Sequence, residues 1–404
     1  MTPTKRWFDA LISQGWRRSL FVFLCCAPLM MGIISRFLKH SHWFSDYDAV
    51  ACAGEKLAHG EDFYALPATW STPCSHGMQS SGYVYPPHVA QMFEVGAEAV
   101  GADVFKAVYL LIAAISFGFL SWFVFLRRGA PAEFWDRAPG FALVTGSLVY
   151  FANIAVPLHA LICLAALAAP KRPWLFALAL AAAAALKPVY LVYGLVLLIL
   201  QAPVLTRLAT GAVATALGLA PTAAFVLGGG EVVAAWRRTL EYFVYDRQPG
   251  EGFYGWLFAL GVDGRGLGPT AACALYVGAL SLAAIAIAVR ARLDGPARVA
   301  LGLGIACLVN PRLSANDILP LALATGSVIA VARAAALPEG ARRGVIALAA
   351  GGLCIGGLGN SLDLGDYCVK ACTLMLTAAV LWMALALVWR SPAAAGRVTS
   401  ASSV

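Results

Sequence analysis

Long apolar runs separated by short polar connections dominate the chain between residues 19 and 390. Many of these runs approach the ~20 residues that an α-helix needs to cross the hydrocarbon core of a bilayer. The pattern predicts about twelve membrane-spanning helices, at residues 19–37, 105–126, 139–152, 155–169, 173–186, 189–205, 208–228, 269–289, 296–309, 315–332, 344–360 and 371–389. We therefore expect an all-α polytopic membrane protein with one membrane domain over residues 19–390.

Composition agrees with this interpretation. Hydrophobic residues make up 60% of the 404 residues and charged residues only 12%, with a mean hydropathy of +0.76. Soluble proteins carry roughly 25% charged residues. The basic segment 1–18 and the apolar run Leu20–Ile34 have the order of a signal peptide, but no small-residue cleavage site follows. The first run is therefore expected to be retained as a helix.

Charge alternates along the predicted connections. If the N-terminus is cytoplasmic, the gaps on its side contain most of the 29 basic residues, and of the 21 acidic residues they hold only Asp9, Glu133, Asp136, Asp294 and Glu339. Basic residues accumulate on the cytoplasmic side of plasma-membrane proteins. This rule accounts for the net charge of +8 without a nucleic-acid partner, and it predicts that both termini are cytoplasmic.

Two of the connections on the opposite side are long, at residues 38–104 and 229–268. Residues 84–101 interleave apolar positions with Glu94 and Glu98, a pattern typical of a helix lying along the membrane surface. The second loop is rich in aromatic residues, as expected of an interfacial belt. The tail 391–404 is rich in Ala and Ser and is expected to be disordered.

The first outer loop begins with Asp46-Tyr47-Asp48. A carboxylate placed just outside the membrane, facing a cavity between helices, has the position of a general base for a sugar or lipid hydroxyl. The alternative is that both aspartates are solvated residues after a transmembrane span. Asp-x-Asp also occurs in metal-dependent enzymes that use nucleotide sugars, but those have a parallel β-sheet, which this sequence does not predict.

Lys187 lies at the outer end of a predicted helix and is followed by Pro188. An ionisable group at membrane depth is a functional candidate, and an ammonium suits a leaving phosphate. The alternative is a lysine whose side chain extends to the lipid headgroups. Arg312 is a second candidate phosphate ligand. In the first loop, a Cys52–Cys74 disulfide is one possibility in an oxidising compartment.

The stretch Asp46-Tyr47-Asp48-Ala49-Val50-Ala51, followed by Gly60 and Tyr64, resembles the first-loop signature of glycosyltransferase family 87. Gly82-Tyr83-Val84-Tyr85-Pro86-Pro87 is similar to the motif that opens the interfacial helix of that family. Three further similarities follow in order along the chain, at Asn153–His159, at Lys187-Pro188 and at Asn310-Pro311-Arg312 with Asp317. Many relatives have a His and an aromatic residue where this chain has Asn316-Asp317.

The resemblance implies a GT-C fold with its active site beneath the first outer loop. It also implies a polyprenyl-phosphate-linked sugar donor, commonly of mannose, a glycolipid or glycan acceptor and inversion at the anomeric carbon without a metal or other cofactor. Asp46 would be the base, with Asp48 as the alternative, and Lys187 and Arg312 would bind the donor phosphate. Residues expected to line the substrate pocket are Tyr64, Tyr83, Tyr85, His88, His159, Asn316 and Asp317.

These similarities predict a glycosyltransferase of the inner (plasma) membrane whose active site faces the periplasm. A transporter or flippase of a lipid-linked sugar is the competing interpretation, since twelve helices and intramembrane charges occur in that class as well. Transporters commonly carry paired repeats with broken helices in matching positions. This chain instead concentrates its polar residues in one outer loop.

Overall fold

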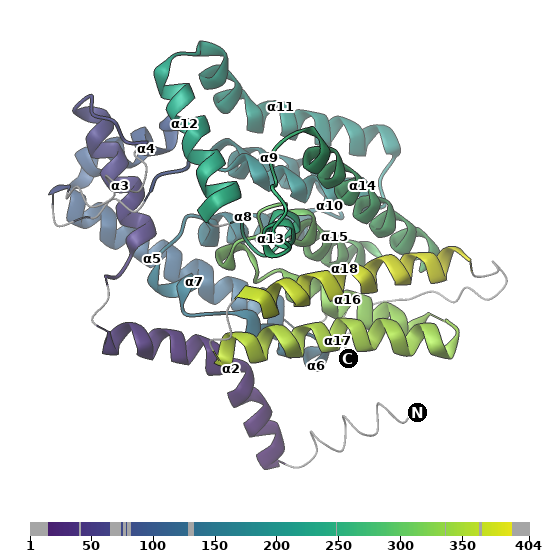
Figure 1. Cartoon of the computed structure of the whole chain (residues 1–404). Helices are drawn as coiled ribbons and strands as arrows, with labels where there is room; N and C mark the ends of the chain where they lie inside the picture. Colours follow the sequence, from purple (N-terminus) through teal and green to yellow (C-terminus); the bar gives the residue numbers. More distant parts are fainter. Residues whose placement is uncertain are drawn as a thin grey trace.

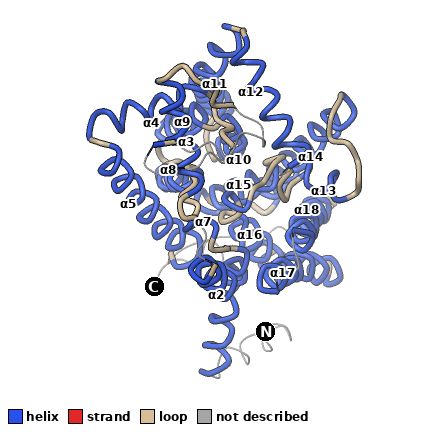
Figure 2. The backbone as a smooth tube through the Cα atoms, turned by 60° about the vertical axis from the view of Figure 1, so that its left-hand side comes forward, coloured by secondary structure: helices blue, strands red, loops and turns tan. Residues whose placement is uncertain are grey.

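A computed structural model describes residues 15–39, 42–64, 74–75, 78, 82–127, 133–247, 249–335, 337–362 and 366–389. The predicted disordered tail 391–404 and most of the N-terminal segment 1–18 lie outside these ranges. Within them the chain forms helices joined by loops, with no strand (Figures 1 and 2). The all-α prediction is thereby confirmed for the described residues.

Eleven apolar helical segments of the described chain coincide with predicted spans, and six of them are long enough to cross a membrane. The long ones are α2 (Gly15–Leu38), α5 (Ala102–Ser121) with its π-helical extension η3 (Trp122–Leu126), α11 (Val204–Gly228), α14 (Leu267–Arg290), α17 (Glu339–Leu362) and α18 (Asp366–Val388). The shorter ones are α8 (Ala155–Ala168), α9 (Pro173–Leu186), the 3₁₀ helix η5 (Pro188–Tyr193) continuing into α10 (Gly194–Ile199), α15 (Gly295–Val309) and α16 (Leu321–Ala334).

The arrangement is that of a helical membrane protein. The long helices α11, α14, α17 and α18 run across the view in Figure 1, and α15 and α16 are buried among them. Large apolar side chains remain exposed on the outer helices, as for Leu275 and Leu282 of α14, which are 75% and 68% exposed. Such surfaces are stable in lipid and not in water.

The predicted span at residues 139–152 is not one helix, and this prediction is corrected. After the single turn α6 (Phe134–Arg137), the chain forms the 3₁₀ helix η4 (Ala138–Leu143) and then the short helix α7 (Ser147–Tyr150). Pro139 and Gly140 lower helix propensity at its start. Gly140 also packs so closely on α16 that an added Cβ would lie 2.3 Å from the Cβ of Ala322. Tight packing therefore favours an irregular backbone here.

The first outer loop contains two helices, α3 (Ser45–Ala58) and α4 (Pro87–Val100). α4 occupies the segment predicted to lie along the interface, and its helical state is confirmed. The two helices touch at Gly54, where an added Cβ would lie 2.8 Å from the carbonyl oxygen of Ala90. A disulfide joins Cys52 of α3 to Cys74. The helices α3 and α4 therefore pack together at the left of Figure 1.

We expect the Cys52–Cys74 bond in protein isolated without reductant, because the two Cα atoms are 5.7 Å apart and both cysteines belong to the predicted outer loop. Closing a loop with a sequence separation of 22 stabilises a fold by about 3 kcal/mol in the chain-entropy model. Mass spectrometry of alkylated peptides should find the cross-linked pair. Quantitative alkylation of both thiols before reduction would contradict this assignment.

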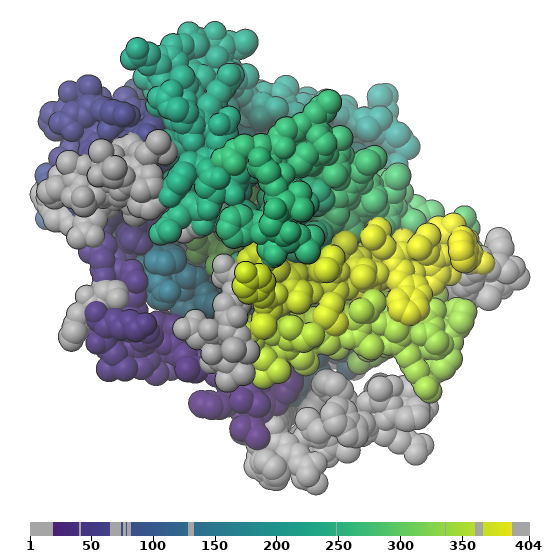
Figure 3. All heavy atoms as spheres, viewed as in Figure 1, coloured from purple at the N-terminus to yellow at the C-terminus, as the bar shows by residue number. Residues whose placement is uncertain are grey.

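The second outer loop also contains helices, namely α12 (Glu231–Glu241), the π-helical turn η6 (Tyr242–Arg247) and α13 (Phe253–Ala259). α12 stands upright beside the ends of the long helices, and α13 lies against α18, which Figure 3 shows as neighbouring surfaces. The indole of Trp256 donates to the hydroxyl of Thr373, 3.0 Å away. Glu251 donates its backbone N–H to Leu313 at 2.6 Å. The second loop therefore covers the turn that follows α15.

Candidate functional site

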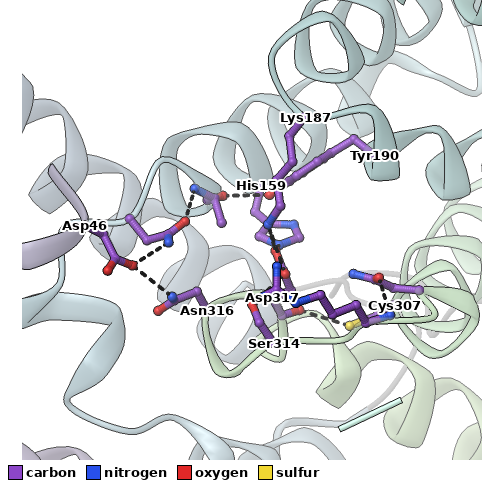
Figure 4. Close-up of polar contacts among 12 residues, drawn as sticks. Asp46, His159, Lys187, Tyr190, Cys307, Ser314, Asn316 and Asp317 are labelled. Atoms are coloured by element: carbon purple, nitrogen blue, oxygen red, sulfur yellow. Dashed lines mark hydrogen bonds and ion pairs between the residues drawn. The ribbon is translucent and has the colours of Figure 1, made fainter. Parts of the chain in front are cut away.

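Asp46 lies in the first turn of α3, and its carboxylate faces residues from two distant connections. Asn153, in the turn between α7 and α8, donates its side-chain amide to Oδ2 of Asp46 at 2.5 Å. Asn316, in the 3₁₀ turn η7 (Ala315–Asp317) between α15 and α16, donates to the same oxygen at 3.4 Å. Both contacts are drawn in Figure 4. The carboxylate is thus held by two neutral amides.

The backbone fixes the position of Asp46 as well. Phe44, just before α3, has a φ of 65°, in the left-handed region, which turns the chain sharply out of the membrane-spanning segment. The N–H of Phe44 donates to the carbonyl of Tyr150 at 2.7 Å, and that of Asp46 donates to Phe151 at 3.1 Å. The start of α3 is therefore anchored on the end of α7.

Asp317 is the centre of a buried network next to Asp46 (Figure 4). Its carboxylate contacts Nζ of Lys187 at 3.0 and 3.1 Å, Nε2 of His159 at 3.0 Å and Oγ of Ser314 at 2.7 Å. Burial raises the pKa of a carboxyl, but here Lys187, His159 and Ser314 outweigh burial and hold the pKa of Asp317 well below its ordinary value. Asp317 is therefore a carboxylate at neutral pH.

Two tyrosines of η5 complete the network. Tyr193 lies with its hydroxyl 3.0 Å from Nδ1 of His159, and the hydroxyl of Tyr190 donates to the carbonyl of Ala155 at 3.0 Å. The ammonium of Lys187 lies 5.5 Å from the centre of the Tyr190 ring. A narrow crevice between α8, η5 and α15 is lined by His159, Tyr190, Tyr193, Asn310 and Asp317.

Arg312 and Tyr85 belong to the same electrostatic neighbourhood. The guanidinium of Arg312 lies over the ring of Phe243, 5.8 Å from its centre, and it attracts both Asp46 and Asp317. Burial raises the pKa of Tyr85, and the charges of Asp46 and Asp317 raise it further. The Tyr85 hydroxyl is accordingly a neutral hydrogen-bonding group at neutral pH.

Burial is also the largest influence on Asp46. It raises the pKa of this carboxyl above the ordinary value, although the bond from Asn153 and the charges of Lys187 and Arg312 act in the opposite direction. Asp317 stays ionised, whereas Asp46 binds a proton more readily. Two neighbouring carboxyls with divergent affinities for protons are typical of sites that perform acid–base chemistry.

Asp48, the alternative base, points elsewhere. Its side chain is buried, with 1% exposed, between Nζ of Lys106 at 3.0 Å and a short contact with the imidazole of His42. Lys106 belongs to α5, so this ion pair ties α3 to α5. The structure therefore brings Asp46 to the polar network, and Asp48 holds the helix that carries it.

The predicted pocket residues of the first loop divide into two groups. Tyr64 and Tyr83 are buried, at 3% and 1% exposed, and their hydroxyls donate to the carbonyls of Tyr85 and Pro86. These two rings stabilise the loop and do not reach Asp46. His88 has its Nε2 2.7 Å from the carbonyl of Ala185, two residues before Lys187. His88 thus connects α4 to the end of α9.

Several members of the site are not predicted by the sequence patterns described above. They are Ser314, Tyr193 and Lys106, the partner of Asp48. Ser314 lies three residues before Asp317, and Tyr190 and Tyr193 are spaced by three on the helix after Lys187. These short spacings in the sequence could have identified Ser314 and Tyr193 as neighbours of the site. The pairing of Asp48 with Lys106 could not be predicted in this way, because it depends on how α3 packs on α5.

Among the described residues, no three His, Cys, Asp or Glu side chains are grouped so as to hold a metal ion. Comparison of the chain with protein-family models, with curated proteins and with solved structures finds no match. The geometry of the Asp46–Asp317 region therefore carries the functional argument.

Proposed function

We propose that this protein is an inverting glycosyltransferase. It transfers a hexose from a polyprenyl-phosphate-linked donor to a glycolipid or glycan acceptor on the periplasmic face of the inner membrane. The observation that carries the proposal is the placement of Asp46, a carboxylate with a raised pKa, beside the cations Lys187 and Arg312. The resemblance to glycosyltransferase family 87 supports mannose as the sugar.

The proposed reaction needs one base and one stabilised leaving group. Asp46 accepts the proton of the acceptor hydroxyl while that oxygen forms a bond to the anomeric carbon. The bond from the anomeric carbon to the phosphate oxygen breaks, and its electron pair leaves with polyprenyl phosphate. A single displacement on the face opposite the phosphate inverts the anomeric centre. No further reactant is required.

Lys187 and Arg312 are placed to bind the phosphate as its charge increases. Lys187 is oriented by Asp317, both of whose carboxylate oxygens contact Nζ, so the ammonium is positioned before substrate arrives. Donors that are fixed in advance stabilise developing charge without reorganising. Tyr85 and Asn316 are suited to hydrogen-bond the sugar, because both lie next to the Asp46 carboxylate.

The proposal includes a twelve-span GT-C topology. Eleven spans are the apolar helical segments described above, and η4 with α7 would make the twelfth as a broken segment. Asp136 pairs with Arg333 of α16 at 2.7 Å, at the end of that helix remote from Asp317. Tyr150, at the other end of the segment, accepts from Phe44 beside Asp46. Residues 137–151 therefore connect opposite ends of the bundle.

We expect the acid limb of the kcat/KM profile to lie at a higher pH than that of an ordinary aspartate, because the base must be ionised and burial raises the pKa of Asp46. Activity should rise with pH through that limb. The measurement is sugar transfer from a short-chain polyprenyl-phosphate mannose by purified protein between pH 3.5 and 8.

Asn153→Ala is the matched variant for this profile. The hydrogen bond from Asn153 lowers the pKa of Asp46, so its loss should move the acid limb to higher pH. A profile that is flat down to pH 3.5, or one unchanged in Asn153→Ala, would contradict the assignment of Asp46 as the base.

A further inference from the structure

Two arginines converge at the end of the bundle remote from Asp46. Arg298 lies in the first turn of α15, whereas the Asp46 network adjoins the last turn of this helix, so about 20 Å of helix separates them. Arg298 donates from Nε to the carbonyl of Leu293 and from Nη1 to that of Ile199, both at 2.9 Å. Arg207 of α11 donates to the carbonyl of Leu198, the residue just before Ile199.

These guanidiniums are bound to carbonyl oxygens and not to carboxylates. Among the described residues neither arginine has an ion pair, and the two cations repel each other. Nε of Arg207 is buried without a hydrogen-bond partner. Asp294, the acidic residue closest in sequence, uses Oδ1 to cap α15 at the N–H of Ala297. Because Nε of Arg207 is buried and Nε of Arg298 is bonded, the Nη groups of the two arginines are the donors that can contact an anion.

Two further cations belong to a neighbouring turn. The turn before α9 carries Lys171 and Arg172, both exposed, and it packs against the start of α15, where an added Cβ on Gly295 would lie 3.0 Å from Pro170. This end of the bundle is the one predicted to face the cytoplasm from its basic residues. The surface is thus strongly positive.

An apolar surface adjoins the cationic one. In the first turns of α11, on either side of Arg207, three large apolar side chains are exposed: Val204 at 59%, Leu205 at 79% and Leu208 at 54%. A free phosphate would gain nothing from them, whereas an acyl chain would cover them. A phospholipid can contact both surfaces at once, with its headgroup phosphate at the arginines and its acyl chain along the apolar side chains of α11.

We propose that Arg207 and Arg298 bind the phosphate of an anionic phospholipid, such as phosphatidylglycerol, at the membrane surface opposite Asp46. Guanidinium groups bind phosphate oxygens in pairs of N–H···O bonds, and the free N–H groups of both arginines are available for such contacts. Lys171 and Arg172 strengthen the local positive potential. The site is separate from the proposed transfer reaction and does not depend on it.

Native mass spectrometry of the purified protein with phosphatidylglycerol and phosphatidylcholine tests this proposal. We expect wild type to prefer phosphatidylglycerol by about tenfold or more, since each basic residue near an anionic headgroup contributes noticeably to binding. Arg207→Gln/Arg298→Gln should lose that preference. The control Arg342→Gln/Arg343→Gln removes two arginines that Glu339 already pairs, and it should retain the preference.

A measurement on wild type covers the case in which the double variant does not fold. A photoreactive phosphatidylglycerol should label peptides that contain residues 198–208 or 291–298. Labelling confined to other segments would overturn the site, as would an unchanged lipid preference in a folded double variant. Displacement of the lipid by millimolar inorganic phosphate would overturn the assignment to a phospholipid.

Discussion

Asp46→Asn should reduce sugar transfer by about 10² to 10⁴-fold, the usual contribution of a general base. Asparagine has nearly the shape of aspartate and can still contact Asn153 and Asn316, but it cannot accept the acceptor proton. Because the substitution removes a carboxylate whose pKa is raised by burial, it should not destabilise the fold. The measurement is the initial rate of transfer in detergent, with thermal unfolding recorded on the same samples.

Two matched variants distinguish this result from a general loss of acidic charge. Asp103→Asn removes an exposed carboxylate from the same face and should leave the rate within about twofold of wild type, since a surface charge in salt acts weakly at a distance. Asp48→Asn should lower stability, because it leaves Lys106 without its partner. If Asp48→Asn is folded but inactive while Asp46→Asn remains active, Asp48 and not Asp46 is the base.

Asp317→Asn should destabilise the protein by about 3 to 5 kcal/mol, the usual cost of removing one partner from a buried ion pair. The carboxylate is 4% exposed, and the substitution would leave the ammonium of Lys187 without the negative charge that it pairs with and would reduce two carboxylate oxygens to one amide oxygen. Unfolding in a mixed-micelle SDS titration at pH 7 measures the difference. Because the pKa of Asp317 is lowered in the fold, this stabilisation should be present at neutral pH and be lost as pH falls below about 4.

An exposed ion pair on the same face serves as the control. Asp246→Asn breaks the pair with Arg265, in which both side chains are 44% exposed, and should change stability little. Lys187→Met in the Asp317→Asn background should recover part of the lost stability, because it removes the uncompensated cation. Equal effects of Asp317→Asn and Asp246→Asn would show that the Asp317 network does not stabilise the fold.

Periodicity and charge predicted much of the helical frame. The apolar runs located eleven of the segments, because a helix in lipid must be apolar over its whole exposed length. The alternation of basic connections assigned Asp46, Lys187 and Arg312 to one side, and the structure brings these residues together. The helices were predicted correctly because one requirement, an apolar surface toward lipid, acts on every residue of such a segment.

The remaining features depend on contacts between distant segments. Residues 139–152 are apolar enough for a span, but close packing on α16 breaks the helix. Tyr83 and Tyr85 belong to one motif and their rings lie with centroids 5.7 Å apart, yet only the hydroxyl of Tyr85 experiences the charge of Asp46. Two tyrosines of one motif thus differ in their distance from the charged network. The hydrophobic pattern of the sequence does not predict which of them lies near Asp46.

The most direct test of the proposed sugar transfer is an assay in detergent. Purified protein is mixed with a polyprenyl-phosphate hexose and an acceptor extract of the cell envelope, and the release of polyprenyl phosphate is measured. The account predicts release coupled to a glycosylated acceptor in wild type, and loss of both in Asp46→Asn. Detergent abolishes the two compartments that a flippase needs. Movement of the intact donor across sealed vesicles, with no release of polyprenyl phosphate in detergent, would contradict the account.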